Sequence, residues 1–357
     1  MLWTLILSAC QNASIRLGEG QISPSPSQEG STINHLSTIT PLSTEVQNQD
    51  PTPQSTPDII QFSLPTPGAQ PETAWRPPLY PVPWAASFND HFYFSRPISV
   101  DQILGSSLDY RYGGTFFKPG AAHTGIDIPA KMGTPVLASG PGEVVWAGWG
   151  LYSNDPSNQD DPYGLAVVMR HDFGYHDLPL YTVYAHLDEV EVVTGQWLQS
   201  GDMLGKVGQT GFTTGSHLHF EVRLGENTYF NTRNPELWLV PPQGWGVLAA
   251  RIADNFNYTV PNTNVTLVSD DTGTEWELRT YPLIGANGDD YYQENLVMSD
   301  LPAGNYTVFF KFFYIPQEIK IQIVPGNITY FSFRGLFGFG PTLPASDKMD
   351  IFFTPTP

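Results

Sequence analysis

The segment "GSHLHFEV", residues 215–222, places two histidines one residue apart in a run that otherwise has the composition of a β-strand. Strand side chains point alternately to two faces, so His217, His219 and Glu221 are expected on one face and the apolar residues on the other. Two interpretations are open at this point. The histidines are either ordinary residues of an exposed polar face or members of a functional site.

The composition of the chain favours strands and turns over long helices. Of its 357 residues, 40% are apolar and 14% are charged, and glycine and proline occur 33 times each. This length allows two domains, and the many turn-forming residues predict a mainly β fold. The net charge of −19 argues against a nucleic-acid partner, because a polyanion needs a basic surface. It is typical of a soluble extracytoplasmic protein.

Shifts in composition predict how the chain is divided. Residues 11–75 are rich in Ser, Thr and Pro and bury too little apolar surface to fold, whereas short strand-like runs follow from residue 76. The turn-rich "PPQGWG" at 241–246 precedes seven or so further strand-like runs, which suggest a β-sandwich. The expected divisions are a signal segment at 1–10, a disordered tether at 11–75, folded domains at 76–240 and 247–335, and a poorly ordered tail at 336–357.

The single cysteine, Cys10, follows an almost wholly apolar run. Nine such residues cannot span a bilayer as a helix, but they have the composition of the end of a secretory signal. "LSAC" at 7–10 also resembles the bacterial lipoprotein signal box. This resemblance implies that Cys10 is lipidated and anchors the protein to a membrane; the alternatives are an ordinary cleaved signal or a chance cysteine. No Lys or Arg precedes the short apolar run, so we expect the start of the signal to be incomplete.

A second motif, "HTGIDIPAKMGTPV" at 123–136, supplies candidate metal ligands. His123 and Asp127 are four residues apart in an extended segment, so their side chains point the same way. With one histidine of "HLH" they form a set of two imidazoles and one carboxylate, which is typical of catalytic zinc sites. Zinc in such a site lowers the pKa of a bound water to about 7. The other histidine of "HLH" and His186, in "YTVYAHL", remain for proton transfer.

Three segments together resemble the lysostaphin-type (LytM-like) zinc endopeptidases, which cut peptide cross-links or bridges of bacterial peptidoglycan: "HTGIDIPAKMGTPVLASGPGEVVWAG", "YAHL" and "VTGQWLQSGDMLGKVGQTGFTTGSHLHFEV". The similarity covers about residues 100 to 240. "GSSLDYRYG", with Arg111, is similar to the segment that precedes the first ligand in this family. The resemblance implies a compact antiparallel β-sheet, one zinc ion per chain and a place in the bacterial cell envelope.

The resemblance also implies a role for each candidate residue. His123, Asp127 and His219 would bind zinc, and His186 and His217 would be the two catalytic histidines that are not ligands. At one position the chain departs from some staphylolytic relatives, which have a tyrosine six residues before the first ligand where this chain has Phe117. A phenyl ring cannot donate a hydrogen bond, so any stabilisation from that hydroxyl is missing or comes from elsewhere.

Other conspicuous residues are given structural interpretations. Glu221 shares a face with the "HLH" histidines and is a possible partner of a ligand, but a solvated strand glutamate is the favoured interpretation. The remaining histidines lie in turns, in the tether or in an aromatic lead-in and are not expected to bind metal: His35, His91, His171 and His176. One aromatic set is expected in the core or at its rim rather than in a glycan platform: Trp146, Trp149 and Tyr152.

The C-terminal part resembles a different family. "NTNVTLVSDDTG", "LVMSDLPAGNYTVFF" and "IVPGNITYFSF" are similar to the carboxypeptidase regulatory-like, transthyretin-like sandwich, which implies a role in binding or spacing. For the whole chain the favoured hypothesis is an active zinc metalloendopeptidase, because all five family positions are filled. The alternatives are a non-catalytic wall-binding or hydrolase-activating module on the same fold, and an adhesive surface protein.

Overall fold

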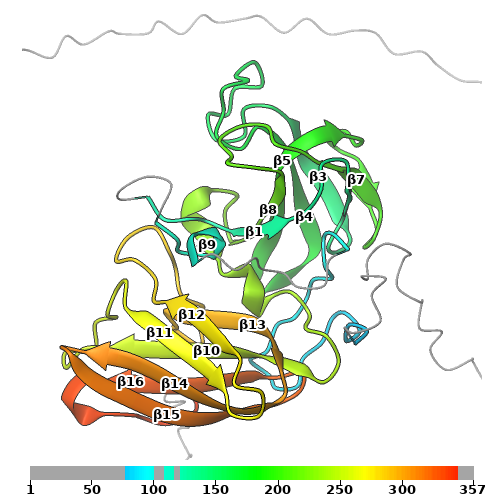
Figure 1. Ribbon diagram of the computed structural model, residues 1–357. Helices are drawn as coiled ribbons and strands as arrows, with labels where there is room; N and C mark the ends of the chain where they lie inside the picture. The colour runs from blue at the N-terminus through cyan, green and yellow to red at the C-terminus, as the bar shows by residue number, and fades with distance from the viewer. Residues whose placement is uncertain (1–76, 100–107, 116–120, 345–357) are drawn as a thin grey trace, which may run out of the picture. The chain divides into compact units, whose positions relative to one another are not determined.

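The structure is a computed structural model that describes residues 77–99, 108–115 and 121–344 (Figure 1). In these residues the chain consists mainly of β-strands with a few short 3-10 turns, which confirms the expected fold class. The described residues contain no helix long and apolar enough to cross a membrane. Several predictions fall outside the described residues: those for Cys10, His35, the tether at 11–75, Phe117 and the last part of the tail.

The first sheet has nine strands, and its strand pairs are antiparallel. Six strands follow the order β1-β8-β5-β4-β3-β6, while β7 pairs with β2 and β5, and β9 pairs with β8. The strands are β1 (Ile126–Pro129), β2 (Pro135–Leu137), β3 (Gly142–Gly148), β4 (Leu165–Tyr175), β5 (Leu178–Val190), β6 (Trp197–Leu198), β7 (Met203–Val207), β8 (His217–Leu224) and β9 (Thr232–Arg233).

Strand β8 carries the "HLHFEV" motif in the interior of this sheet. It lies between β1 and β5, and all eight of its residues are buried. Leu218, Phe220 and Val222 pack into the large apolar core, so His217 and His219 lie on the other face, as the alternation predicts. The interpretation of these histidines as ordinary residues of an exposed polar face is therefore wrong, because neighbouring strands and loops cover that face as well.

The C-terminal part forms two further sheets, which we call the C-terminal sheets. One has the order β13-β10-β16 and the other β12-β11-β14-β15; only β10 and β16 pair in parallel. The strands are β10 (Trp245–Ala253), β11 (Asn264–Ser269), β12 (Glu275–Arg279), β13 (Leu296–Pro302), β14 (Gly304–Phe312), β15 (Ile315–Ile323) and β16 (Ile328–Arg334).

Strand β10 is buried on both faces and connects two apolar cores. Leu248 and Ala250 belong to the core that the two C-terminal sheets share. Val247 and Ala249, which alternate with them, belong to the core of the first sheet. Because strand side chains alternate, the three-stranded sheet packs on one face against the four-stranded sheet and on the other against the first sheet. Residues 241–246 therefore connect two groups of strands that share a core.

The buried histidine of β4 generates a prediction about pH. His171 hydrogen-bonds through Nδ1 to the Pro141 carbonyl (2.9 Å) and through Nε2 to Thr182 Oγ1 (2.9 Å). Burial lowers its pKa to about 4, from 6.5 in an exposed histidine. Between these values the unfolded chain binds more protons than the folded one, so the free energy of unfolding is unaffected above pH 6.5 and falls as the pH drops toward 4.

We expect this loss to reach about 3 kcal/mol for His171 alone. Urea denaturation over this pH range should therefore show a shallower pH dependence in His171→Gln than in the unsubstituted protein. The contributions of all other titrating groups are the same in both proteins, so they cancel when one curve of unfolding free energy against pH is subtracted from the other. Two parallel curves would contradict the assignment of a neutral, buried His171.

Candidate metal centre

Three predicted ligands converge at the end of β1. His123 precedes this strand, Asp127 lies in it, and His219 is the residue directly opposite Asp127 in β8. His123 Nε2 lies 3.0 Å from both Asp127 Oδ1 and His219 Nδ1, and the latter two atoms are 2.9 Å apart. All three side chains are buried, and among the described residues they are the one such group whose possible ligand atoms converge, within 4.8 Å.

In His123 and His219, the ring nitrogen that points away from the three-residue cluster, which we call the outer nitrogen, lies within hydrogen-bond distance of an acceptor oxygen. His123 Nδ1 lies 3.0 Å from the carbonyl oxygen of Arg111, and His219 Nε2 lies 3.1 Å from Glu221 Oε1. A proton on each outer nitrogen donates to these oxygens and leaves the inner nitrogen for Asp127 or for a metal ion. This is the usual arrangement behind metal-binding histidines, and with one carboxylate the donor set fits a zinc ion.

Charges inside the cluster shift the protonation of its members. Burial by itself would raise the pKa of Asp127, but His123 and His219 outweigh it and hold this pKa well below its usual range. Burial by itself would lower the pKa of His219, but hydrogen bonds to Asp127 and Glu221 raise it to about 9. A metal ion at Nδ1 would replace the proton there, so we expect metal binding to release a proton near neutral pH.

Two more predicted histidines lie beside these three residues. His217 Nε2 is 3.5 Å from Asp127 Oδ1, is buried, and has no hydrogen-bond partner among the described residues, while its Nδ1 lies 2.8 Å from the Gly215 carbonyl oxygen. The rings of His186 and His217 are 4.8 Å apart. Burial lowers the pKa of both, in His186 to about 3, so both are neutral at pH 7. The structure thus brings together all five residues selected from the sequence.

The backbone of His186 adopts a conformation that the sequence did not reveal. Its φ of +62° lies in the left-handed region, which costs a non-glycine residue about 1–3 kcal/mol and is retained only where its surroundings force it. His186 lies in β5 where the register shifts against β4, and the register against β7 shifts just after it, between Leu187 and Glu189. Its N–H donates to the Tyr163 carbonyl (2.9 Å) and its Nδ1 contacts the Thr210 carbonyl oxygen (2.8 Å), so the ring is held beside His217.

Glu221 is completely buried, so the expectation of a solvated glutamate is wrong. Its Oε1 accepts hydrogen bonds from Thr124 Oγ1 and from Tyr163 Oη (2.7 Å), in addition to the contact with His219. Its Oε2 lies 2.6 Å from Arg223 Nη2 and accepts from Arg223 Nε (2.7 Å). No sequence pattern singled out Thr124, Tyr163 and Arg223, although Arg223 follows Glu221 by two residues and therefore shares its face of β8.

The other residues singled out in the sequence lie elsewhere. His91 is buried, with Nε2 3.3 Å from Asp289 Oδ2. His171 lies in the core, as described above. Trp146 packs against a small apolar cluster, and Tyr152 is half-exposed with its ring 5.2 Å from that of Tyr229, which agrees with positions in the core and at its rim.

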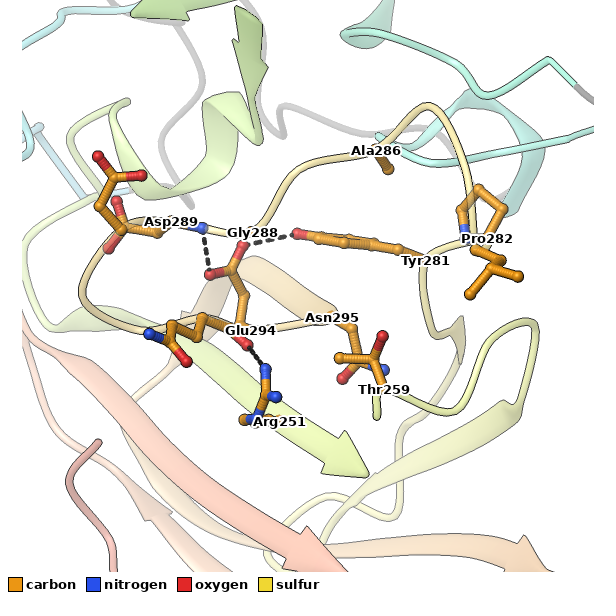
Figure 2. Close-up of a pocket in the computed structure, with 12 residues that line it drawn as sticks. Arg251, Thr259, Tyr281, Pro282, Ala286, Gly288, Asp289, Glu294 and Asn295 are labelled. Carbon is orange, nitrogen blue, oxygen red and sulfur yellow. Dashed lines mark hydrogen bonds between the residues drawn. The ribbon is translucent and has the colours of Figure 1, made fainter. Parts of the chain in front are cut away.

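A cavity of about 510 Å³ lies in the C-terminal part and not at the histidines (Figure 2). Asp289 and Glu294 are buried carboxylates in its lining. Burial and the charge of Asp289 raise the pKa of Glu294 to about 8, so this group is largely protonated at pH 7. Several of its polar groups are hydrogen-bonded to one another, whereas Asp289 Oδ2 has no hydrogen-bond partner among the described residues and lies 3.3 Å from His91 Nε2.

Comparison with known proteins places the cluster in a family. Residues 121–232, which include all five histidine and aspartate positions, match the model of Peptidase family M23. Over these residues the chain is similar to the M23 (lysostaphin-type) peptidases. The match ends before β10, so the resemblance of residues 247–335 to a transthyretin-like sandwich stays a prediction.

Individual relatives match the same region. The chain is 39% identical over 102 residues to DD-carboxypeptidase/endopeptidase Mpg of Neisseria meningitidis, covering 29% of this chain and 20% of the relative. It is 34% identical over 127 residues to peptidoglycan DD-endopeptidase ShyA of Vibrio cholerae, covering 35% and 26%. The catalytic domain of lysostaphin from Staphylococcus simulans is 27% identical, covering 35% of this chain and 86% of that one, with a TM-score of 0.30. The chain thus spans about a fifth to a quarter of the two curated relatives.

The buried position of Glu221 predicts a large effect on stability. Glu221→Gln removes the negative charge that faces Arg223 and leaves a buried cation without its counter-ion. We expect the free energy of unfolding, measured with a chelator present, to fall by about 3 kcal/mol. The matched control is Glu189→Gln, which removes a half-exposed partner of Lys206 and should leave this free energy nearly unchanged, because solvent screens an exposed ion pair. Equal effects of the two substitutions would show that Glu221 is not a buried charge.

Proposed function

We propose that the protein is a zinc-dependent endopeptidase that hydrolyses peptide cross-links or bridges of bacterial peptidoglycan, outside the cytoplasm. The observation that carries this proposal is the convergence of His123, Asp127 and His219 beside two neutral histidines, within the part of the chain that matches Peptidase family M23. The relative ShyA is named as a peptidoglycan endopeptidase, which supports the substrate class.

The three ligands in this proposal are His123 through Nε2, Asp127 through its carboxylate and His219 through Nδ1. They would hold one zinc ion per chain. Bound there, zinc supplies a Lewis acid and lowers the pKa of water to about 7. The carbonyl of Arg111 and the carboxylate of Glu221 hold the two rings in the ligating orientation.

His217 and His186 are proposed as the catalytic histidines. In each, Nδ1 donates to a main-chain carbonyl, of Gly215 and Thr210 respectively, so the neutral ring has a lone pair at Nε2. A neutral imidazole can accept a proton from the attacking water and pass it to the leaving amine. Once protonated, it can donate a hydrogen bond to the negative oxygen of the tetrahedral intermediate.

The proposal is tested directly on cell-wall fragments. The full chain is incubated with muropeptides of known cross-linking, with zinc and with a chelator, and the products are identified by mass. Cleavage of peptide cross-links with zinc alone supports the enzyme. A zinc-loaded protein that binds muropeptides without cleaving them would support the alternative, a non-catalytic wall-binding or hydrolase-activating module.

Single substitutions separate the metal ligands from the catalytic histidines. His219→Ala should lose both zinc and activity, because it removes a donor atom. His217→Ala and His186→Ala should retain zinc and lose about 10²–10⁴-fold in rate, as expected for a general acid or base. Zinc content is measured by metal analysis and rate by product formation. Loss of zinc in His217→Ala together with its retention in His219→Ala would reverse the assignment.

We also propose that Cys10 is lipidated and anchors the protein to a membrane. Cys10 follows the small-residue box "LSA", and a lipoprotein cysteine carries a diacylglyceryl group, whose several chains bind membranes stably where one chain binds marginally. With a complete signal in front, the protein should fractionate with membranes and incorporate labelled palmitate, whereas Cys10→Ser should do neither. Equal recovery of both versions in the soluble extracytoplasmic fraction would leave "LSAC" as the end of an ordinary secretion signal.

A further inference from the structure

The first ligand, His123, is held by a segment outside the sheet. β1 begins only at Ile126, so the β1–β8 ladder does not include His123. Instead its N–H donates to the Gly114 carbonyl (2.7 Å) and its carbonyl accepts from the Gly113 N–H (2.9 Å). Its ring is held through Nδ1 by the Arg111 carbonyl (3.0 Å). Residues 110–114, which we call the ligand-holding segment, therefore fix both the backbone and the ring of His123.

Tyr112 joins the ligand-holding segment to Thr232 of β9 and to the connection between β12 and β13 in the C-terminal part. Tyr112 Oη donates to the Thr232 carbonyl (3.1 Å) and accepts from the Asn287 N–H (2.8 Å). Its ring lies edge-on to that of Tyr281, with centroids 5.2 Å apart. Tyr112 is buried, so these contacts form without competition from water.

Gly113 allows this close approach. A Cβ at this position would lie 3.1 Å from Tyr281 Cδ1 and 3.2 Å from Pro282 Cδ, and the φ of +81° is one that glycine adopts without strain. On the other side of His123, a Cβ on Gly285 would lie 3.0 Å from that of Ala122. The loop from Tyr281 to Gly285 therefore fits closely against the chain on both sides of the metal ligand.

A buried charge pair forms the second contact. Arg111 Nη1 lies 3.9 Å from Glu236 Oε2, and the same oxygen accepts hydrogen bonds from Ser299 N (2.7 Å) and Ser299 Oγ (2.9 Å) in β13. Asp300, the next residue in β13, pairs with Arg96 at 2.5 Å. Glu236, which accepts hydrogen bonds from Ser299 in β13, thus faces the side chain of Arg111. The main-chain carbonyl of Arg111 in turn orients the ring of His123.

The tyrosine against which Tyr112 and Gly113 pack is itself fixed in place. Figure 2 shows Tyr281 pointing across the cavity to Glu294, and its hydroxyl donates to Glu294 Oε1 (3.1 Å). The same hydroxyl accepts from Asn234 Nδ2 (2.9 Å). Glu294 Oε2 in turn accepts from the Asp289 N–H (2.8 Å). Tyr281 therefore offers a rigid surface to the ligand-holding segment.

We infer that the C-terminal part is a structural part of the metal site: Tyr281 and Asn287 contact the ligand-holding segment directly, Ser299 acts on it through Glu236, and the segment positions His123 for metal binding. The inference rests on the proposed function, because it takes His123 as a ligand. Coupling between two sites is reciprocal, so metal binding must strengthen the contact between this segment and the C-terminal sheets by the same factor by which the contact strengthens metal binding. Tyr112 is then a positioning residue.

The test compares two Tyr→Phe substitutions in the full chain. Tyr112→Phe removes the hydroxyl that joins the ligand-holding segment to Asn287. Tyr306→Phe is the matched control, because its buried hydroxyl donates to the Pro302 carbonyl (2.7 Å) within the C-terminal sheets. The zinc dissociation constant is measured by competition with a chromophoric chelator. We expect Tyr112→Phe to weaken zinc binding about tenfold, as for partners behind metal ligands, and Tyr306→Phe to change it less than about twofold.

A second measurement uses the unsubstituted protein and does not depend on a variant that folds. Zinc should slow hydrogen exchange at the Asn287 amide, because this amide donates to Tyr112 Oη. Unchanged exchange at Asn287, or equal zinc affinity in Tyr112→Phe and Tyr306→Phe, would overturn the inference while leaving the zinc site intact. An unsubstituted protein that binds no zinc would overturn the proposed function too.

Discussion

The pairing of Asp127 with His219 across β1 and β8 is the constraint on which the site depends. The same ladder places Ile126 opposite Phe220 on the other face, in the apolar core. A slip of one residue would move the histidines into that core and the apolar side chains onto the polar face. The apolar core therefore fixes the register, and the register fixes the geometry of the candidate metal centre.

A cluster of this kind is costly to bury, because polar and charged groups lose their hydration. The structure offsets this cost with hydrogen bonds to main-chain carbonyls behind His123, His186 and His217, and with the carboxylate of Glu221 behind His219. Arg223 balances the charge of that carboxylate. The polar face of β8 is therefore buried like the apolar face. Hydrogen bonds and ion pairs stabilise the polar face, and apolar packing stabilises the other.

The sequence predicted the features that depend on local periodicity. Alternation along "HLHFEV" and the spacing of His123 and Asp127 follow from strand geometry, and the five site residues could be selected on that basis together with a family resemblance. Burial of Glu221 could not be predicted, because it depends on which strands flank β8. The left-handed backbone of His186 could not be predicted either, since it arises where the pairing of β5 with β4 shifts its register. The contacts of Arg111 join residues too distant in the sequence for any local pattern to reveal.

These long-range contacts also bear on what counts as the functional unit. The family match ends at residue 232, yet Glu236 lies beyond it and Ser299 lies in β13. Strand β10 contributes alternate side chains to two cores, so the first sheet cannot be separated from the C-terminal sheets without exposing apolar surface on both. An attached module that only bound a partner or acted as a spacer would need neither a shared core nor an ion pair behind a candidate metal ligand. The extent of the contacts, and not the extent of the sequence match, therefore defines the unit that holds the candidate site.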